Sequence, residues 1–247
     1  MSGAAAVDVS PFDLGPRNGA AALCLHGLTG TPYEVRPLGE ALAANGIRAR
    51  GPVLPGHNAT PEELARVPYT AWVDAARDEL EGLRVDHADV FVVGLSMGGL
   101  VTLALAAEGG VPRIAVVATP LRFRAPIPLL ISLVRHVKPF LRKGGGSDIR
   151  DEAARARHPS YPAMPLESVH QLIQLQARVR SLLSRIEVPA LVAHGRHDKT
   201  ASPDDAHTLH RELAKSELLF LEDSAHVVPV DHDGPRLAEA VVAFLTR

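Results

Sequence analysis

This sequence has few cysteines, few aromatic residues and a small net charge, and each shortage argues against one kind of site, pocket or partner. A single cysteine, Cys24, rules out an intramolecular disulfide and a zinc site built on cysteines, so we interpret it as a small core residue. The formal net charge of −2 gives no reason to expect a nucleic acid or an acidic membrane surface as a partner. Aromatic residues make up 4% of the chain, so we expect a substrate pocket with aliphatic walls rather than one of stacked rings.

Long hydrophobic runs are also missing. The apolar run IPLLISLV, at residues 127–134, is far too short to cross a bilayer. The first twelve residues lack the basic region and the long apolar region of a signal peptide. We therefore expect a cytoplasmic protein without stable membrane insertion.

Short apolar runs alternate with amphipathic, alanine-rich segments, which is typical of a parallel sheet covered by helices on both faces. The expected strands are Ala21–Leu25, Ile47–Ala49, Val90–Val93, Ile114–Ala118, Ala190–Ala193 and Leu218–Leu221. The expected helices are Val35–Ala44, Ala71–Leu83, Met97–Ala107, Pro203–Leu213 and Pro235–Leu245. Between 121 and 186 the alternation stops, and prolines, the run KGGGS and helical segments such as SVHQLIQLQARVRSLL replace it. We predict one α/β core domain from residues 1–120 and 187–247, with a helical cap inserted at 121–186.

The run Gly94-Leu95-Ser96-Met97-Gly98 reads G-x-S-x-G between a strand-like FVV and a helix-like MGGLVTLALAA. In that context the motif is typical of a tight turn that lifts the serine out of the sheet, because side chains at the two glycines would collide with neighbouring backbone. The alternative is an ordinary glycine-rich turn with a serine N-cap, and the flanking strand and helix favour the nucleophile. Gly99 is not part of the motif, and we assign it to close packing of the helix against a neighbouring strand.

A serine hydroxyl needs a base, and the base needs an orienting acid. Where a G-x-S-x-G turn supplies the nucleophile, the acid and then the histidine follow later in the chain, each after a strand. Asp198 follows the apolar run VPALVAHG, and His226 follows LLFLE, so we predict the triad Ser96, Asp198 and His226. Asp223 is a rival acid on the same loop as His226, and His232 is our second choice for the base.

The tetrahedral intermediate of ester hydrolysis needs two N–H donors for its oxyanion. We expect them from the backbone of Met97, directly after the serine, and of Leu28, in the loop HGLTGTP. The residues expected to bind substrate are His26, Gly27, Leu129, Ile131 and Val227. We expect most apolar residues of the cap to pack against the core domain and a few to face the serine. An aliphatic pocket of this kind favours substrates with short- to medium-chain acyl groups.

The motifs HGLTGTP, LPGHNATPEEL, GLSMGG, HGRHD and DSAHVV, in this order, resemble those of the small bacterial carboxylesterases and monoacylglycerol lipases of the α/β-hydrolase superfamily. The resemblance spans about residues 23–245 and is weakest in the cap. It implies a mainly parallel sheet of six or seven strands with a small helical cap, the triad and oxyanion donors named above, and no cofactor or metal. Two features depart from the family: the N-terminal hairpin must be shortened or missing, and Gly56-His57-Asn58 stands where G-H-G is usual. Asparagine tolerates positive φ, so the turn can survive the change, and we interpret His57 as stabilising its loop.

The sequence therefore predicts a carboxylesterase that acts on small-molecule esters of short to medium acyl chains, as a monomer or small homo-oligomer. A monoacylglycerol lipase shares every catalytic residue and is the first alternative. Amide, thioester and C–C bond hydrolases use the same triad. A non-catalytic ligand receptor of the same fold is the alternative of a different class, and it would be expected to lack a triad member.

Overall fold

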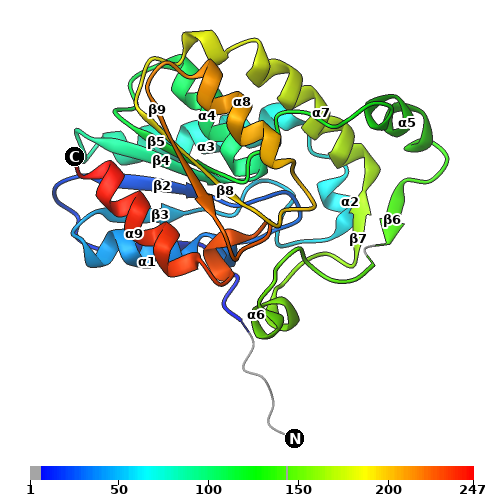
Figure 1. Cartoon of the computed structure of the whole chain (residues 1–247), viewed down its shortest axis with the longest axis horizontal. Coiled ribbons are helices and arrows are strands. Elements are labelled where there is room, and N and C mark those ends of the chain that lie inside the picture. The colour runs from blue at the N-terminus through cyan, green and yellow to red at the C-terminus, as the bar shows by residue number, and fades with distance from the viewer. Residues whose placement is uncertain (1–6, 143) are drawn as a thin grey trace, which may run out of the picture.

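The computed structural model describes residues 7–142 and 144–247, and a seven-stranded sheet with helices on both faces forms its centre (Figure 1). The strand order is β1-β3-β2-β4-β5-β8-β9, in which β1 runs antiparallel to β3 and the other neighbouring strands are parallel. The strands are β1 (Phe12–Leu14), β2 (Ala21–Leu25), β3 (Arg48–Gly51), β4 (Val90–Leu95), β5 (Ile114–Val117), β8 (Ala190–Gly195) and β9 (Ser216–Leu221). The predicted fold class, including the sheet of six or seven strands, is confirmed.

Two layers of helices bury the two faces of the sheet, which explains why its strands are apolar at consecutive positions. One face packs against α3 (Tyr69–Arg84), α4 (Met97–Glu108) and α8 (Pro203–Glu212), and the other against α1 (Arg36–Ala44) and α9 (Gly234–Leu245). All six strands and five helices expected from the sequence are present, with ends shifted by no more than two residues. Cys24 is fully buried in β2, where burial raises the pKa of its thiol to about 12, so its interpretation as a core residue is confirmed.

The sheet has a topological switch point between β2 and β4. After β2 the chain passes through α1 to β3 on one side, whereas after β4 it passes through α4 to β5 on the other side. Two connections that diverge in this way leave a crevice beyond the carboxyl ends of the strands, which is where ligands bind in open α/β sheets. The serine motif follows β4, and the loop HGLTGTP follows β2.

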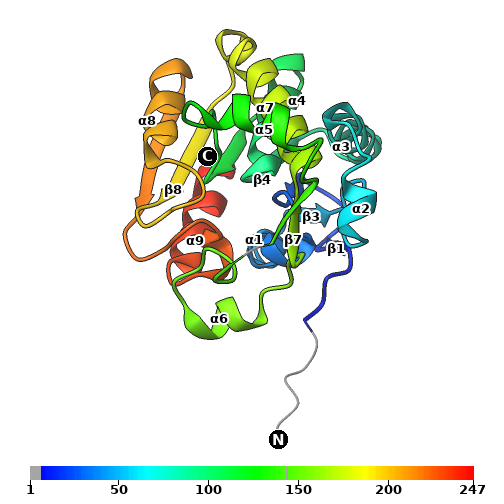
Figure 2. The same cartoon turned by 90° about the vertical axis from the view of Figure 1, so that its right-hand side faces the viewer.

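Residues 121–186, which we call the cap segment, lie between β5 and β8 in the chain. Most of the cap segment is at one end of the sheet, on the right in Figure 1 and facing the viewer in Figure 2, and its last part extends back over α4. It contains α5 (Ile127–Val134), α6 (Glu152–Arg157), α7 (Leu166–Arg180) and the antiparallel pair β6 (Phe140–Arg142) and β7 (Ala163–Pro165). We did not expect these two strands, because three residues are too few to show a strand periodicity. The short helices are η1 (Pro32–Glu34), α2 (Pro61–Leu64), η2 (Leu183–Arg185) and η3 (Val228–Val230).

Helix α5 corrects one expectation about the cap. We expected most of its apolar side chains to dock on the core domain, yet none of its residues is buried, and Leu129 is 63% exposed. Helix α5 contacts α7 instead. The apolar character of a side chain shows that its burial would be favourable, but it does not show which surface the side chain will contact. The parts of the cap segment that face the end of the sheet lie outside α5.

Both departures from the family pattern have a local explanation. From residue 7 onward, where the structure describes the chain, the N-terminal hairpin is reduced to the strand β1, which pairs with β3 at the edge of the sheet. Asn58 has a φ of 52°, so it keeps the left-handed turn that a glycine would otherwise provide. His57 is buried with its Nδ1 3.1 Å from the carbonyl oxygen of Pro55, within its own loop. In the part of the chain that the structure describes, no helix has the length and apolar character needed to traverse a bilayer.

Candidate active site

Ser96 occupies a strained turn between β4 and α4. Its φ of 55° and ψ of −116° lie in a region that non-glycine residues rarely adopt, at a cost of about 1–3 kcal/mol. The flanking glycines make the turn possible: a Cβ on Gly94 would lie 2.2 Å from the carbonyl oxygen of Gly98, and one on Gly98 would lie 2.2 Å from that of Leu25. A Cβ on Gly99 would meet the Thr119 hydroxyl, just after β5, so its predicted packing role is confirmed.

The histidine ring lies between the serine and the aspartate. Nε2 of His226 is 2.9 Å from Oγ of Ser96, and Nδ1 is 2.8 Å from Oδ2 of Asp198. Ser96 directly follows β4, Asp198 lies in the loop after β8, and His226 lies in the loop after β9. All three residues are buried. Because a carboxylate faces Nδ1, that nitrogen carries the proton and Nε2 accepts from the serine hydroxyl. The structure thus brings together the three residues of the predicted triad.

Asp198 is an ionised carboxylate held by several donors. Its Oδ1 accepts the N–H groups of Thr200 at 2.8 Å and of Ala201 at 2.7 Å, and Nε2 of His194 lies 3.0 Å from Oδ2. Burial opposes ionisation, but the charge of His226 and the contacts with His194 and His226 outweigh it, so the pKa of Asp198 lies well below its ordinary value. Our sequence reasoning missed His194, because a single histidine in an apolar strand carries no signal of the carboxylate that it will meet.

The imidazole of His226 is a stronger base than an ordinary histidine. Burial by itself would lower its pKa, but the charge and the hydrogen bond of Asp198 outweigh that effect, with smaller contributions from the charges of Asp148 and Glu34. The net result is a pKa of His226 above its usual value. Such a group accepts the serine proton readily and holds it while an intermediate forms.

The rival residues lie elsewhere. The side chain of Asp223 is 73% exposed and contacts Arg150, and the side chain of His232 is 49% exposed with its Nδ1 3.9 Å from Asp151. Neither contacts the Ser96–His226–Asp198 network in the described parts of the chain.

The loop after β2 lies against Ser96, and buried hydrogen bonds hold its backbone in place. A Cβ on Gly27 would be 3.4 Å from that of Ser96. The N–H of Gly27 donates to Oε2 of Glu34 at 2.9 Å, and its carbonyl oxygen lies 2.9 Å from Nδ1 of His26. Nε2 of His26 accepts the N–H of Leu54 at 3.1 Å, which leaves the proton on Nδ1. These buried contacts fix the backbone around Leu28.

Glu34 also connects this loop to the cap segment. Nε2 of His158 lies 3.1 Å from Oε1 of Glu34, and both side chains are almost fully buried. Burial would raise the pKa of Glu34, but His158, His26 and the Gly27 N–H outweigh it and lower that pKa below its ordinary value. A buried negative charge therefore lies beneath the loop that we expect to supply an oxyanion donor. Glu34 had no role in our prediction, since its histidine partner, His158, is more than a hundred residues away in the chain.

A cavity of about 380 Å³ contains Ser96 and His226. Its other lining residues are Leu28, Thr29, Glu34, Pro120, Phe123, Gly144, Gly146, Ser147, Asp148, His158, Ser160, Met164, Val169, Leu172, Thr200 and Val227. Of the residues expected to bind substrate, Val227 lines this cavity. His26 and Gly27 support the loop beside it, and Leu129 and Ile131 lie on α5, outside its lining.

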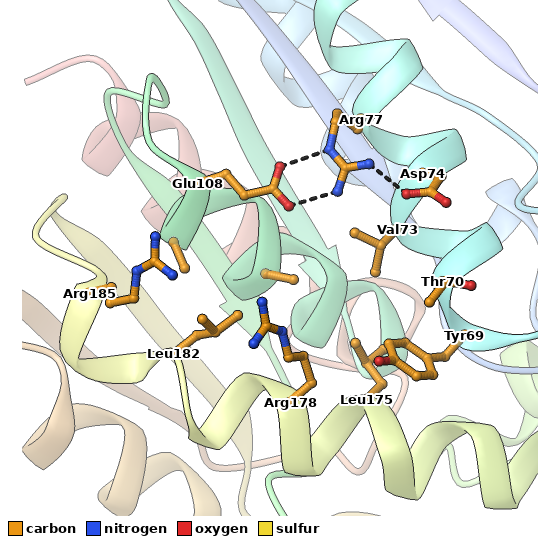
Figure 3. A pocket seen from close by; sticks show the side chains of 12 residues that line it. Tyr69, Thr70, Val73, Asp74, Arg77, Glu108, Leu175, Arg178, Leu182 and Arg185 are labelled. Atoms are coloured by element: carbon orange, nitrogen blue, oxygen red, sulfur yellow. Dashed lines mark hydrogen bonds and ion pairs between the residues drawn. The ribbon is translucent and has the colours of Figure 1, made fainter.

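A second cavity, of about 170 Å³, lies between α3, α4 and α7 (Figure 3). It contains none of the triad residues, and Arg77 within it is held by the carboxylates of Glu108 and Asp74. We therefore assign it no reaction. Among residues 7–142 and 144–247, no group of three or more histidine, cysteine, aspartate or glutamate side chains is arranged to hold a metal ion.

The sheet topology, the strained serine after β4 and the Ser96–His226–Asp198 network together define an α/β-hydrolase. A family model described as serine aminopeptidase, S33 (Hydrolase_4) matches residues 16–233, and the chain belongs to that family.

Similar proteins agree with this assignment. A thermostable monoacylglycerol lipase from Bacillus sp. (strain H-257) is 30% identical over 234 residues, which cover 91% of this chain and 90% of the lipase. A carboxylesterase from Bacillus subtilis (strain 168) is 26% identical over 230 residues, 92% of each chain. Among solved structures, one described under LipS and LipT, two metagenome-derived lipolytic enzymes, has a TM-score of 0.89 at 30% identity and covers 96% of this chain and 97% of that chain. These matches place the chain among the esterase- and lipase-type α/β-hydrolases.

Proposed function

We propose that the protein is a carboxylesterase that cleaves esters of short- to medium-chain acids through an acyl-enzyme. The observation that carries the proposal is the unbroken chain of contacts from Ser96 Oγ through His226 to Asp198 at the wall of a cavity. The relatives named above, which are a lipase and an esterase at 26–30% identity, support the same reaction class.

The reaction proceeds in two steps. His226 takes the proton of Ser96 through Nε2 while the serine oxygen attacks the ester carbonyl. The alcohol then leaves with that proton, and a water molecule activated by the same imidazole releases the acid from Ser96. Asp198 keeps the proton of the neutral ring on Nδ1 and stabilises the doubly protonated ring that forms in each step.

The oxyanion of each tetrahedral intermediate rests on two backbone N–H groups, those of Met97 and Leu28. Met97 is the first residue of α4, so its N–H also lies at the positive end of a buried helix. Leu28 follows Gly27, whose place beside Ser96 and whose bond to Glu34 hold this part of the loop still. Donors fixed before the reaction stabilise the developing charge without the cost of reorganisation.

The cavity offers an apolar surface suited to an acyl chain. Phe123, Met164, Val169 and Leu172, all from the cap segment, supply apolar side chains around the serine. The volume of about 380 Å³ lies toward the lower end of the range for small-molecule pockets, which favours chains of limited length.

A monoacylglycerol lipase is the second candidate, because polar groups line the same cavity. Ser147, Asp148, His158 and Ser160 come from the cap segment and could bind the free hydroxyls of a glycerol leaving group. This would give an ester of glycerol an advantage over an ester of a simple alcohol with the same acid.

A panel of matched esters tests both proposals. With p-nitrophenyl esters from acetate to palmitate, we expect kcat/KM to be highest at short or medium chains and to fall toward palmitate. Glyceryl monooctanoate and ethyl octanoate share the acyl group and differ only in the alcohol. A clear preference for the glyceryl ester would favour the lipase, equal rates would favour the carboxylesterase, and cleavage of amides or thioesters in preference to esters would contradict both.

The raised pKa of His226 predicts the pH dependence of the reaction. The imidazole must be neutral to act as base, so kcat/KM should rise with pH and level off above the pKa of the free enzyme. Because that pKa is raised, the midpoint should lie above the ordinary histidine value of about 6.5. Initial rates with p-nitrophenyl octanoate between about pH 5 and pH 9 would measure it, with circular dichroism as a control for folding. A midpoint below the ordinary value would contradict the assignment.

A further inference from the structure

Asp148 of the cap segment contacts both loops that carry the acid and the base. Its Oδ2 accepts the N–H groups of Lys199 at 2.8 Å and Thr200 at 3.0 Å, and the Thr200 hydroxyl at 3.0 Å. These donors directly follow Asp198. The backbone carbonyl oxygen of Asp148 accepts the N–H groups of His226 at 3.0 Å and Val227 at 3.3 Å. One residue of the cap segment thus receives five hydrogen bonds from the loops after β8 and β9.

Asp148 is linked to Asp198 through one backbone N–H group that both carboxylates share. The N–H of Thr200 lies 2.8 Å from Oδ1 of Asp198 and 3.0 Å from Oδ2 of Asp148, so one backbone group is held between the two carboxylates. A movement of Asp148 would shift Thr200, and with it the carboxylate that orients His226.

The neighbouring residues anchor Asp148 itself. Asp231 is buried, and its carboxylate accepts the N–H groups of Arg150 at 2.9 Å and Asp151 at 2.8 Å on the cap side, and of Ala225 at 2.8 Å on the loop that carries His226. Ile149 is 3% exposed and belongs to the buried hydrophobic cluster that also contains residues of α1 and α9. The strap 148–151 is therefore fixed to the core domain, unlike the exposed α5.

We propose that Asp148 is a positioning residue, which holds the loop of Asp198 against the loop of His226 and faces the imidazole with its charge. The proposal rests on the proposed esterase function, in which these two loops must keep a fixed register. The cap segment then has a task beyond covering the substrate, because its residues 148–151 complete the framework that holds the triad. Asp148 and His226 line the same cavity, so the carboxylate also contributes to the field at the ring.

Three carboxylates around His226 favour its protonated form. Asp198 comes from the loop after β8, Asp148 from the cap segment and Glu34 from η1, with His158 of the cap segment paired to Glu34. Removing the charge of Asp148 alone should therefore lower the pKa of His226 without disturbing its bond to Asp198.

Two substitutions separate the hydrogen bonds from the charge. Asp148→Ala removes the acceptor for Lys199 and Thr200, and a misplacement of the triad by a fraction of an ångström should lower kcat by about 10- to 100-fold with little change in KM. Asp148→Asn keeps an acceptor oxygen for the same donors, so kcat should stay within a few-fold of the parent while the midpoint of the pH profile moves to lower pH.

Asp151→Asn is the matched control on the same strap. Its side chain caps α6, a role that asparagine fills equally well, and both kcat and the midpoint should be unchanged.

A fluorophosphonate that labels the active serine provides a readout independent of the substrate. It counts intact sites, so kcat per labelled site distinguishes poor positioning from partial unfolding. Parental kcat and labelling rate per site in Asp148→Ala overturn the proposal, and so does an unmoved midpoint in Asp148→Asn. If Asp148→Ala does not fold, Asp148→Asn decides alone through its midpoint. A parent protein that is labelled at Ser96 but hydrolyses no ester would instead refute the esterase function, and the labelling rates of the variants, with the pH dependence of labelling, would still test Asp148.

Discussion

Replacement of Ser96 by alanine is expected to lower kcat/KM for p-nitrophenyl octanoate by at least about 10⁴-fold, because no other group can form the acyl-enzyme. Alanine removes one oxygen from a buried turn and keeps the glycines that shape it, so the variant should fold. Its thermal unfolding, followed by circular dichroism, should remain cooperative and close to that of the parent. The activity loss is then chemical rather than structural.

The control for Ser96 is a serine that has no contact with the triad. The Ser132 hydroxyl bonds to the carbonyl oxygen of Leu129 within the exposed helix α5, so Ser132→Ala should retain full activity. A fluorophosphonate should label the parent at Ser96 and leave Ser96→Ala unlabelled, as shown by mass spectrometry of peptides. Labelling at another residue, or an alanine variant with parental turnover, would contradict the assignment of the nucleophile.

The double variant Ser96→Ala/His226→Ala should be no slower than Ser96→Ala alone. The two residues act as one unit, so removing the base from an enzyme that already lacks its nucleophile should cost little further activity.

The three residues of the Ser96–His226–Asp198 network could be picked out from the sequence because their signals are local. Ser96 is marked by glycines whose role is steric, and the structure shows each of those glycines facing a backbone oxygen where a Cβ would collide. Asp198 and His226 are marked by their places after apolar strands, and parallel strands bring such loops to one edge of the sheet. Neither inference needs a contact between distant side chains to be known in advance.

The groups that support the triad could not be predicted in the same way. His194 lies near the end of an apolar strand, Glu34 meets a histidine of the cap segment, and Asp148 follows a glycine run whose path no pattern fixes. Each acts through a partner that only the folded chain brings near. The cap segment shows the same limit, since its apolar helix α5 is exposed while short polar stretches on either side of α6 line the cavity.

Asp198→Asn is expected to lower kcat by about 10⁴-fold, and the hydrogen bonds around the carboxylate explain why. Oδ1 accepts two backbone N–H groups, from Thr200 and Ala201, so the amide oxygen of asparagine will take that position. The amide NH₂ must then face Nδ1 of His226, where it can only donate. The ring proton is driven to Nε2, and a ring with its proton there cannot accept the proton of Ser96.

The matched control is Asp223→Asn, which makes the same change in charge one loop away. The Asp223 side chain is mostly exposed and contacts Arg150 rather than the histidine ring, so kcat should stay within a few-fold of the parent. Steady-state kinetics at the pH of maximal activity would compare the two variants, and the labelling rate at Ser96 should fall together with kcat in Asp198→Asn. If instead Asp223→Asn were the inactive variant and Asp198→Asn turned over within tenfold of the parent, the acid would be misassigned. The buried contacts of Asp198 argue for the first outcome, because in the described part of the chain it is the carboxylate that the structure places against Nδ1 of His226.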